Sequence, residues 1–371
     1  MIRRVLILIA LCLLAAVPAF AQSEDSAAPP QQAETIRQAL FDAQIALMEG
    51  EQDAALDDVR RAASTAEGAF TAFDAATITR LDDLFTQLES AVESEDSAAF
   101  ASLRSTVWTT LLQGGMRVTL SAVAVGNGDT AALWLPLREF RPSNRFSRPD
   151  ADATLAVAAL RRGAVEPETV AAAVQADLYD TYQGQLLAAL SDADSAHANG
   201  FALRQAEEAG RAAGLFEILA DAYAAQRSDQ ALAEVRAAFA SLVESSIRAD
   251  DAAFSAARAA IDSALGSFRA APLTDEELAR RAGQLMRYIA LVPVEYARGV
   301  RDGVVASPIE IQEAITFHEG ASAAFADLRP TLSTLDAETT DRAAVLLTQT
   351  RTQIDTTADP AAVQTSINDL T

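Results

Sequence analysis

Two pairs of carboxylates in the stretch from residue 285 to residue 319 have the residue type and the spacing of a cation site. On a helix, Glu295 and Asp302 fall within one narrow stripe, and Glu310 and Glu313 share one face of the helix that follows. If the two helices form a hairpin, the carboxylates of the first helix can face those of the second. Carboxylate oxygens suit iron, calcium and manganese. The pattern therefore predicts a hard-metal site formed by Glu295, Asp302, Glu310 and Glu313.

The same residues also fit an ordinary structural role. Ser307 and Glu310 have the spacing of a capping box at the start of a helix, with Pro308 at its first position. Glu295, Arg298 and Asp302 lie three to four residues apart, the spacing of ion pairs within one helix. His318 is turned by about 140° from Glu313 on an ideal helix and does not complete the site. A metal site and simple ion pairing both remain open.

A second unusual stretch, the strap of residues 133–150, is rich in arginine, aromatic residues and proline. Three prolines within 14 residues, Pro136, Pro142 and Pro149, exclude a continuous helix. Guanidinium groups pair well with carboxylates on neighbouring helices or on a partner protein. We expect a clamp between acidic helices, or a docking surface, formed by Arg138, Arg141, Arg145 and Arg148.

Several kinds of chemistry are excluded by the inventory of reactive residues. The one cysteine, Cys12, lies inside an expected signal peptide, so the mature chain has no thiol. The two histidines, His197 and His318, are far apart in sequence, and His197 falls in a turn-like segment, residues 191–200. No nucleophile elbow, phosphate loop, zinc-protease motif or dinucleotide fingerprint is present. We expect a protein that is not an enzyme.

Apolar residues recur at helical spacing along most of the chain, and no alternating strand pattern appears. The repeating unit is an apolar helix, a short acidic or glycine-containing turn and a helix of small residues. The fold class is therefore all-α, with helical hairpins packed as a bundle or as a short solenoid. Further on, Thr274 and Glu277 form a capping box, and a helix is expected at about residues 308–326.

The chain divides into six expected segments. Residues 1–21 have the basic start, the apolar run and the Ala19-Phe20-Ala21 cleavage site of a signal peptide. The other expected segments are a disordered lead-in at 22–33, an N-terminal helical hairpin domain at 34–132, the strap at 133–150, a C-terminal helical domain at 151–330, and a tail with short helices at 331–371.

Charge and hydropathy limit the partners. The formal net charge is −23 and becomes more negative once Arg3 and Arg4 leave with the signal peptide. Nucleic acid is therefore excluded as a partner. No later apolar run reaches the roughly 18–20 residues that a membrane helix needs, so we expect a mature chain that does not span the membrane. The signal peptide predicts a periplasmic or otherwise exported protein.

Three long strings resemble the extracytoplasmic region of bacterial iron permeases of the FTR1 type. They are LWLPLREFRPSNRFSRPDADATLA at residues 133–156, VQADLYDTYQGQL at 174–186 and LVPVEYARGVRDGVVASPIEIQEAITFHEGA at 291–321. The resemblance extends over roughly residues 34–330. It implies a part in iron uptake, with iron as the ligand and a membrane iron permease or another uptake-system protein as the partner.

The chain departs from this family in one respect that matters for function. The family's membrane domain binds iron through Arg-Glu-x-x-Glu motifs, whereas here Arg138-Glu139 is followed by Phe140, Arg141 and Pro142. Permease activity therefore does not carry over to this chain. What carries over is an exported accessory that holds or passes iron or docks to a permease. The alternative is a helical scaffold or interaction module with no ligand of its own.

Overall fold

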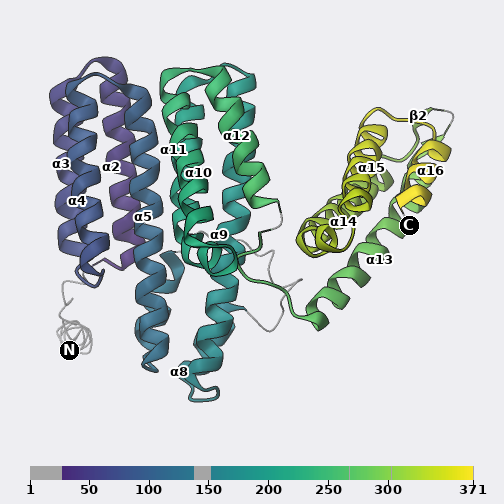
Figure 1. The fold of residues 1–371 in the computed structure, drawn as a ribbon, viewed down its shortest axis with the longest axis horizontal. Helices are drawn as coiled ribbons and strands as arrows, with labels where there is room; N and C mark the ends of the chain where they lie inside the picture. The colour runs from purple at the N-terminus through teal and green to yellow at the C-terminus, as the bar shows by residue number, and fades with distance from the viewer. Residues whose placement is uncertain (1–26, 138–151, 267, 302, 371) are drawn as a thin grey trace, which may run out of the picture.

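The computed structural model describes residues 27–137, 152–266, 268–301 and 303–370, and these residues are almost entirely helical (Figure 1). The predicted all-α fold is confirmed. The helices form two units with separate hydrophobic cores. We call residues 27–271 the N-terminal unit and residues 273–370 the C-terminal bundle. The expected signal peptide, most of the strap with Arg138, Arg141, Arg145 and Arg148, and Asp302 lie outside the described residues.

The N-terminal unit consists of antiparallel helical hairpins around one core. Helix α5 contacts α2, α4, α9 and α10, so helices distant in sequence share the core, as in a bundle and unlike a solenoid. The helices are α2 (Pro29–Glu49), α3 (Gln52–Ala69), α4 (Ala75–Glu93), α5 (Ser97–Ala124), α6 (Gly128–Trp134), the short 3-10 turn η1 (Leu135–Leu137), α8 (Ala153–Arg161), α9 (Pro167–Ala198), α10 (Ala202–Gln226), α11 (Asp229–Arg248) and α12 (Asp251–Leu265).

Local sequence explains where these helices begin and how closely they pack. Side chains of Asp96, Ser228 and Asp250 accept hydrogen bonds from the first turns of α5, α11 and α12. Gly214 of α10 lies against Thr109 of α5, where a Cβ atom would collide with the Thr109 side chain. The small residue thus permits the close approach of the two central helices.

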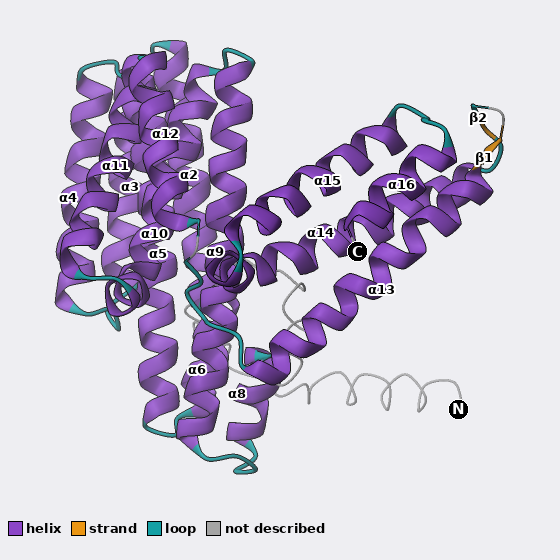
Figure 2. Ribbon diagram, turned by 45° about the vertical axis from the view of Figure 1, so that its right-hand side comes forward, coloured by secondary structure: helices purple, strands orange, loops and turns teal. Residues whose placement is uncertain are grey.

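The C-terminal bundle is a four-helix bundle whose first two helices are joined by a short β-hairpin (Figure 2). Strands β1 and β2 pair antiparallel, with Val300 opposite Val305. The fully buried Tyr296 donates a hydrogen bond from its hydroxyl group to the carbonyl of Ala358. This bond holds the first helix of the bundle to the turn that precedes its fourth helix. The elements are α13 (Asp275–Gly299), β1 (Val300–Arg301), β2 (Val304–Val305), α14 (Pro308–Leu335), α15 (Ala337–Asp355) and α16 (Pro360–Leu370).

The structure divides the chain at residues 266–274, and not at the strap as expected. Val157 and Val174, which follow the strap, share one core with the hairpins that precede it. The helices of the expected tail, 331–371, instead pack on α13 and α14 through Leu347, Ile354 and Val363. The turns that separate hairpins are visible in the sequence, but which hairpins share a core depends on long-range packing.

Three local expectations also differ from the structure. Helix α2 begins at Pro29 within the expected lead-in of 22–33, because proline suits the first helical position and Ala33 is buried. Residues 133–137 of the strap form the end of α6 and η1, with Trp134 packed on Phe70 and Phe73. Residues 191–198, expected as a turn, continue α9.

Candidate functional site

The α13–α14 hairpin places three of the four predicted ligands together. Glu295 lies near the end of α13, and Glu310 and Glu313 lie in the first turns of α14. One carboxylate oxygen from each lies within 4.8 Å of the other two. We call these three residues the carboxylate cluster. Asp302, the fourth predicted ligand, lies outside the described residues.

Two glycines position the cluster. Gly303 has a φ of 74°, a conformation that residues with a Cβ atom rarely adopt, and it forms the tight turn between β1 and β2. Gly299 lies against Ile311, where a Cβ atom would come within 2.6 Å of the Ile311 side chain. The end of α13 and the start of α14 can therefore approach each other closely, which brings Glu295 to Glu310.

The three carboxylates differ in exposure and in partners. The Glu295 residue is only 7% exposed, and its Oε2 accepts a hydrogen bond of 2.7 Å from Arg298. Glu310 is half-buried and Glu313 is exposed. The Arg298 side chain is 62% exposed, so it can leave Glu295 for water. The predicted ion pair between Glu295 and Arg298 is confirmed. Glu295 is the carboxylate of the cluster that forms an ion pair with Arg298.

Crowding of like charges changes the protonation of the cluster. A hydrogen bond with the Glu295 carboxyl raises the pKa of Glu310, and partial burial and the charges of Glu295 and Glu313 act in the same direction. The charge of Arg298 opposes this shift. Loss of a proton from Glu310 is therefore less favourable than from an isolated carboxyl group, because its pKa is raised.

The predicted capping box at Ser307 is wrong. The Ser307 side chain accepts no hydrogen bond from α14, and the Glu310 carboxyl turns to Glu295 and not back to the Ser307 amide. The box at Thr274 and Glu277 is present, with both of its reciprocal hydrogen bonds. The structural role that the sequence offered for Glu310 is therefore absent.

The donor set fits a hard cation. Bonds from such cations to oxygen are about 2.0–2.6 Å, so two oxygens on one ion lie at most about 5 Å apart. The carboxylate cluster, with its spacing of up to 4.8 Å, satisfies this limit. Three carboxylates and the exposed guanidinium of Arg298 give the cluster a net negative charge. The three carboxylates can together bind a divalent or trivalent cation.

Neither histidine joins the cluster. His318 is buried, and its Nε2 lies 2.8 Å from the carbonyl oxygen of Leu347. Burial lowers the pKa of His318, and the hydrogen bond to Leu347 opposes that effect. His197 lies in the last turn of α9, where its ring stacks on Phe254 at 4.5 Å. The prediction that His318 stands apart from Glu313 is confirmed.

One buried acid, Glu208 of α10, is not found by sequence reasoning. It is fully buried, and its two oxygens lie 2.6 Å from Arg204 and 4.0 Å from Arg211, without the geometry of a hydrogen bond. Burial raises the pKa of Glu208, and the two arginines oppose the shift. In the sequence, the spacing of Arg204, Glu208 and Arg211 is that of ordinary ion pairs on a helix surface. Because fully buried glutamates are rare, this spacing gives no sign that Glu208 is buried.

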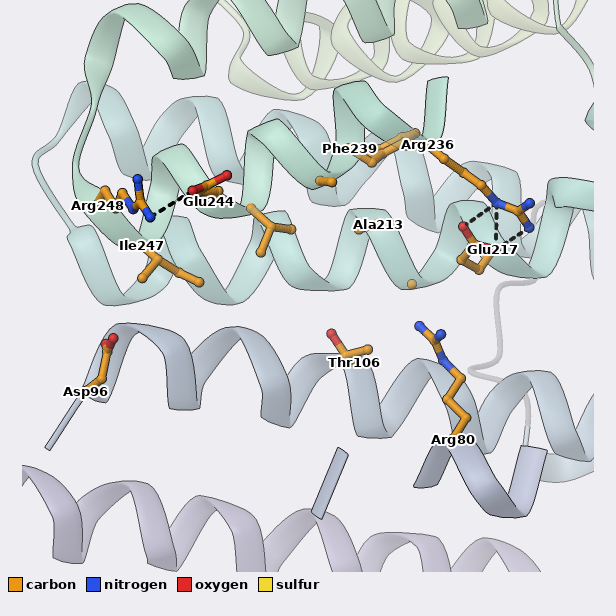
Figure 3. Close-up of a pocket in the computed structure, with 13 residues that line it drawn as sticks. Arg80, Asp96, Thr106, Ala213, Glu217, Arg236, Phe239, Glu244, Ile247 and Arg248 are labelled. Carbon is orange, nitrogen blue, oxygen red and sulfur yellow. Dashed lines mark hydrogen bonds and ion pairs between the residues drawn. The ribbon is translucent and has the colours of Figure 1, made fainter. Parts of the chain in front are cut away.

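A groove of about 690 Å³ runs between α5 and the pair α10 and α11 (Figure 3). At one end Arg236 donates a hydrogen bond of 2.7 Å to Glu217, and at the other Arg248 forms an ion pair of 2.9 Å with Glu244. Figure 3 shows that within each pair the two side chains point toward one another. Because these charges are already matched, the groove shows no set of convergent ligands comparable to the carboxylate cluster.

Among the described helices, none combines the length and the apolar character required to cross a membrane. The chain matches two protein families along nearly all of its length. Residues 26–268 match the iron permease FTR1 N-terminal domain, and residues 273–371 match the iron permease-associated 4-helix bundle domain. The boundary between the two matches coincides with the division between the two units. No curated protein and no solved structure shows significant similarity.

Proposed function

This chain belongs to the iron permease FTR1 family, and from that membership we propose that it is an exported accessory component of an iron-uptake system. In this role it holds iron and passes it to a membrane iron permease or to another protein of the uptake system. Export rests on the signal-peptide pattern of residues 1–21. The role requires no catalysis.

The observation that carries the proposal is the carboxylate cluster. Glu295, Glu310 and Glu313 come from two helices of the bundle and place oxygens within 4.8 Å of one another. Oxygen ligands suit ferrous and ferric iron. Iron is the cargo here: Glu295 binds from the buried side, Glu313 from solvent, and the half-buried Glu310 completes the set.

Partial exposure suits transfer better than storage. Glu313 is exposed, and Arg298 can return to Glu295 when the cation leaves. A site that offers three protein ligands to a cation leaves coordination positions for water or for a ligand from a partner protein. Iron can therefore leave without unfolding of the bundle.

A second candidate function is a helical scaffold that docks to a partner and binds no ion. The Glu295–Arg298 pair favours it, because this pair satisfies the most buried carboxylate of the cluster without a metal. Its docking surface would include Arg138, Arg141, Arg145 and Arg148.

Anaerobic titration of ferrous iron into the mature chain by calorimetry distinguishes the two functions. We expect one saturable site, which is lost or weakened at least tenfold in Glu295→Gln and in Glu313→Gln. Arg298→Gln should tighten binding, since the guanidinium no longer competes for Glu295. Manganese in place of iron tests whether the site is selective.

Glu276→Gln is the matched control. It removes one negative charge from the same helix α13, at a side chain that is 89% exposed and far along the helix from the cluster. Binding in this variant should equal that of the parent. Absence of saturable binding in the parent, or equal losses in Glu276→Gln and Glu295→Gln, would rule out the iron-holding function and favour the scaffold.

A further inference from the structure

The segment that joins the two units is fixed to the N-terminal unit as far as Ala271. The ring of Phe268 is buried against Tyr223, with centroids 5.0 Å apart. Gln183 of α9 donates to the Phe268 carbonyl and accepts from the Ala270 amide, both at 2.8 Å. Gln226 of α10 donates to the Arg269 carbonyl at 2.9 Å. Ala271 is buried in the same core, and its carbonyl accepts a hydrogen bond of 3.0 Å from Arg269. Any pivot between the units therefore lies after Ala271, at residues 272–274.

From this fixed segment the side chain of Arg269 crosses to the C-terminal bundle. Its Nη2 donates to Asp180 of α9 at 3.0 Å, within the N-terminal unit. Its Nη1 donates to the carboxylate of Asp327 at 3.0 Å and to the Asp327 carbonyl at 3.1 Å, both in α14. The Arg269 and Asp180 side chains are only 13% and 6% exposed. Arg269 thus links α9 to α14 by charge.

Helix packing between the two units is slight. Among the described residues, no helix from α2 to α12 packs extensively along a helix from α13 to α16. Figures 1 and 2 show the bundle standing beside the N-terminal unit at an angle, with α14 nearest α9. The contact made by Arg269 is therefore well placed to influence the relative position of the units.

Each partner of this contact also has a counter-charge within its own unit. Asp327 accepts a hydrogen bond of 2.7 Å from Arg281 of α13, whose side chain is 8% exposed. Arg269 keeps Asp180. Separation of Arg269 from Asp327 therefore leaves no charge without a partner, and an ion pair broken in this way costs much less than one that leaves a buried charge alone.

We propose that the Arg269–Asp327 contact is a reversible latch that holds the C-terminal bundle against the N-terminal unit. When the latch opens, the bundle swings about residues 272–274 as a rigid body, while Asp180–Arg269 and Arg281–Asp327 stay intact. The latch sets the position of the whole bundle and does not depend on whether the carboxylate cluster binds iron.

Distances between spin labels on the two units test the latch in the full mature chain. The chain without residues 1–21 contains no cysteine, so Ser241→Cys in α11 and Gln349→Cys in α15, both exposed positions, give a clean label pair. At low salt we expect one narrow distance distribution. Arg269→Gln should give a broad distribution with longer distances. High salt should change the distribution little, because the Arg269 and Asp327 side chains are only 13% and 25% exposed and salt screens mainly exposed charges.

Arg281→Gln is the control, since it removes an arginine partner of the same Asp327 but leaves the cross-unit contact. Its distribution should stay narrow. Circular dichroism checks that each variant keeps its helices, and Asp327→Asn, which weakens the same contact from α14, replaces Arg269→Gln if that variant fails to fold. Equal distributions in Arg269→Gln and the parent would overturn the latch, as would a broad distribution in the parent.

Discussion

Glu310 illustrates how one side chain can have a role that its position in the sequence conceals. Its spacing from Ser307 predicts a helix cap, yet its carboxyl contacts Glu295 across the hairpin. The pKa of Glu310 is raised through that contact, and a metal binds only the deprotonated carboxylate. Under the proposed function, protons and iron therefore compete for the cluster.

The first prediction concerns this competition. The affinity of the parent for ferrous iron should fall as the pH is lowered through the raised pKa of Glu310, since the cation binds only the deprotonated carboxylate. Calorimetry at a series of pH values measures both the affinity and the protons released. In Glu310→Gln the proton release should shrink. Equal proton release in the parent and in Glu310→Gln would contradict a role for the raised pKa of Glu310.

The second prediction concerns His318. Burial holds its folded-state pKa below the unfolded value of about 6.5, so the unfolded chain takes up the proton first as the pH falls. The contribution of His318 to stability is thus present above that value and is lost as the pH falls toward the folded pKa. Urea unfolding of the bundle should show this loss in the parent and a flatter pH dependence in His318→Gln. An unchanged slope in the variant would refute it.

At the scale of elements, the cluster depends on how closely α13 and α14 approach at Gly299. A Cβ atom there would meet Ile311 at 2.6 Å and its backbone nitrogen at 3.1 Å, so the hairpin must open to accept it. Overpacking of this kind costs about 1–3 kcal/mol. Glu295 and Glu310 lie on either side of this contact.

The third prediction follows from that geometry. Gly299→Ala should destabilise the bundle by about 1–3 kcal/mol and weaken iron binding, measured by urea unfolding and calorimetry. Gly283→Ala is the matched control, because Gly283 lies in the same helix with no atom within 4 Å of its added Cβ. It should stabilise the helix by roughly 0.5–1 kcal/mol and leave binding unchanged. Equal effects of the two substitutions would show that the close approach is unimportant.

Element type and some helix starts are predictable from the sequence, because they depend on local signals. The box at Thr274 and Glu277 and the helix start at Pro308 are both found in the structure. The three clustered carboxylates were also predicted, since their spacing on a hairpin brings them together. The assignment of the 331–371 helices to the bundle and the burial of Glu208 depend on contacts between distant segments, which no local pattern contains.

At the scale of the whole molecule, the chain has two cores and one narrow junction. The core of the C-terminal bundle, with Ile289, Tyr296 and Phe325, is separate from that of the N-terminal unit. Phe268 belongs to the N-terminal core, although it lies only six residues before the cap of α13. Each unit should therefore be able to fold without the other.

The fourth prediction tests this independence. A chain of residues 273–371 should fold to a helical, cooperatively unfolding monomer and bind iron with nearly the affinity of the mature chain, because all three cluster residues lie within it. Circular dichroism and calorimetry provide the measurements. A truncated chain that is unfolded, while the full chain unfolds in a single transition, would show that the two cores are not independent.

The most direct test of the iron site is crystallographic. Crystals of the mature chain grown anaerobically with ferrous iron, measured at the iron absorption edge, would locate the ion by its anomalous scattering. We predict one strong peak within about 2.0–2.6 Å of oxygens from Glu295, Glu310 and Glu313. A peak elsewhere, or none at the cluster in crystals that contain iron, would contradict the proposal that these carboxylates hold iron.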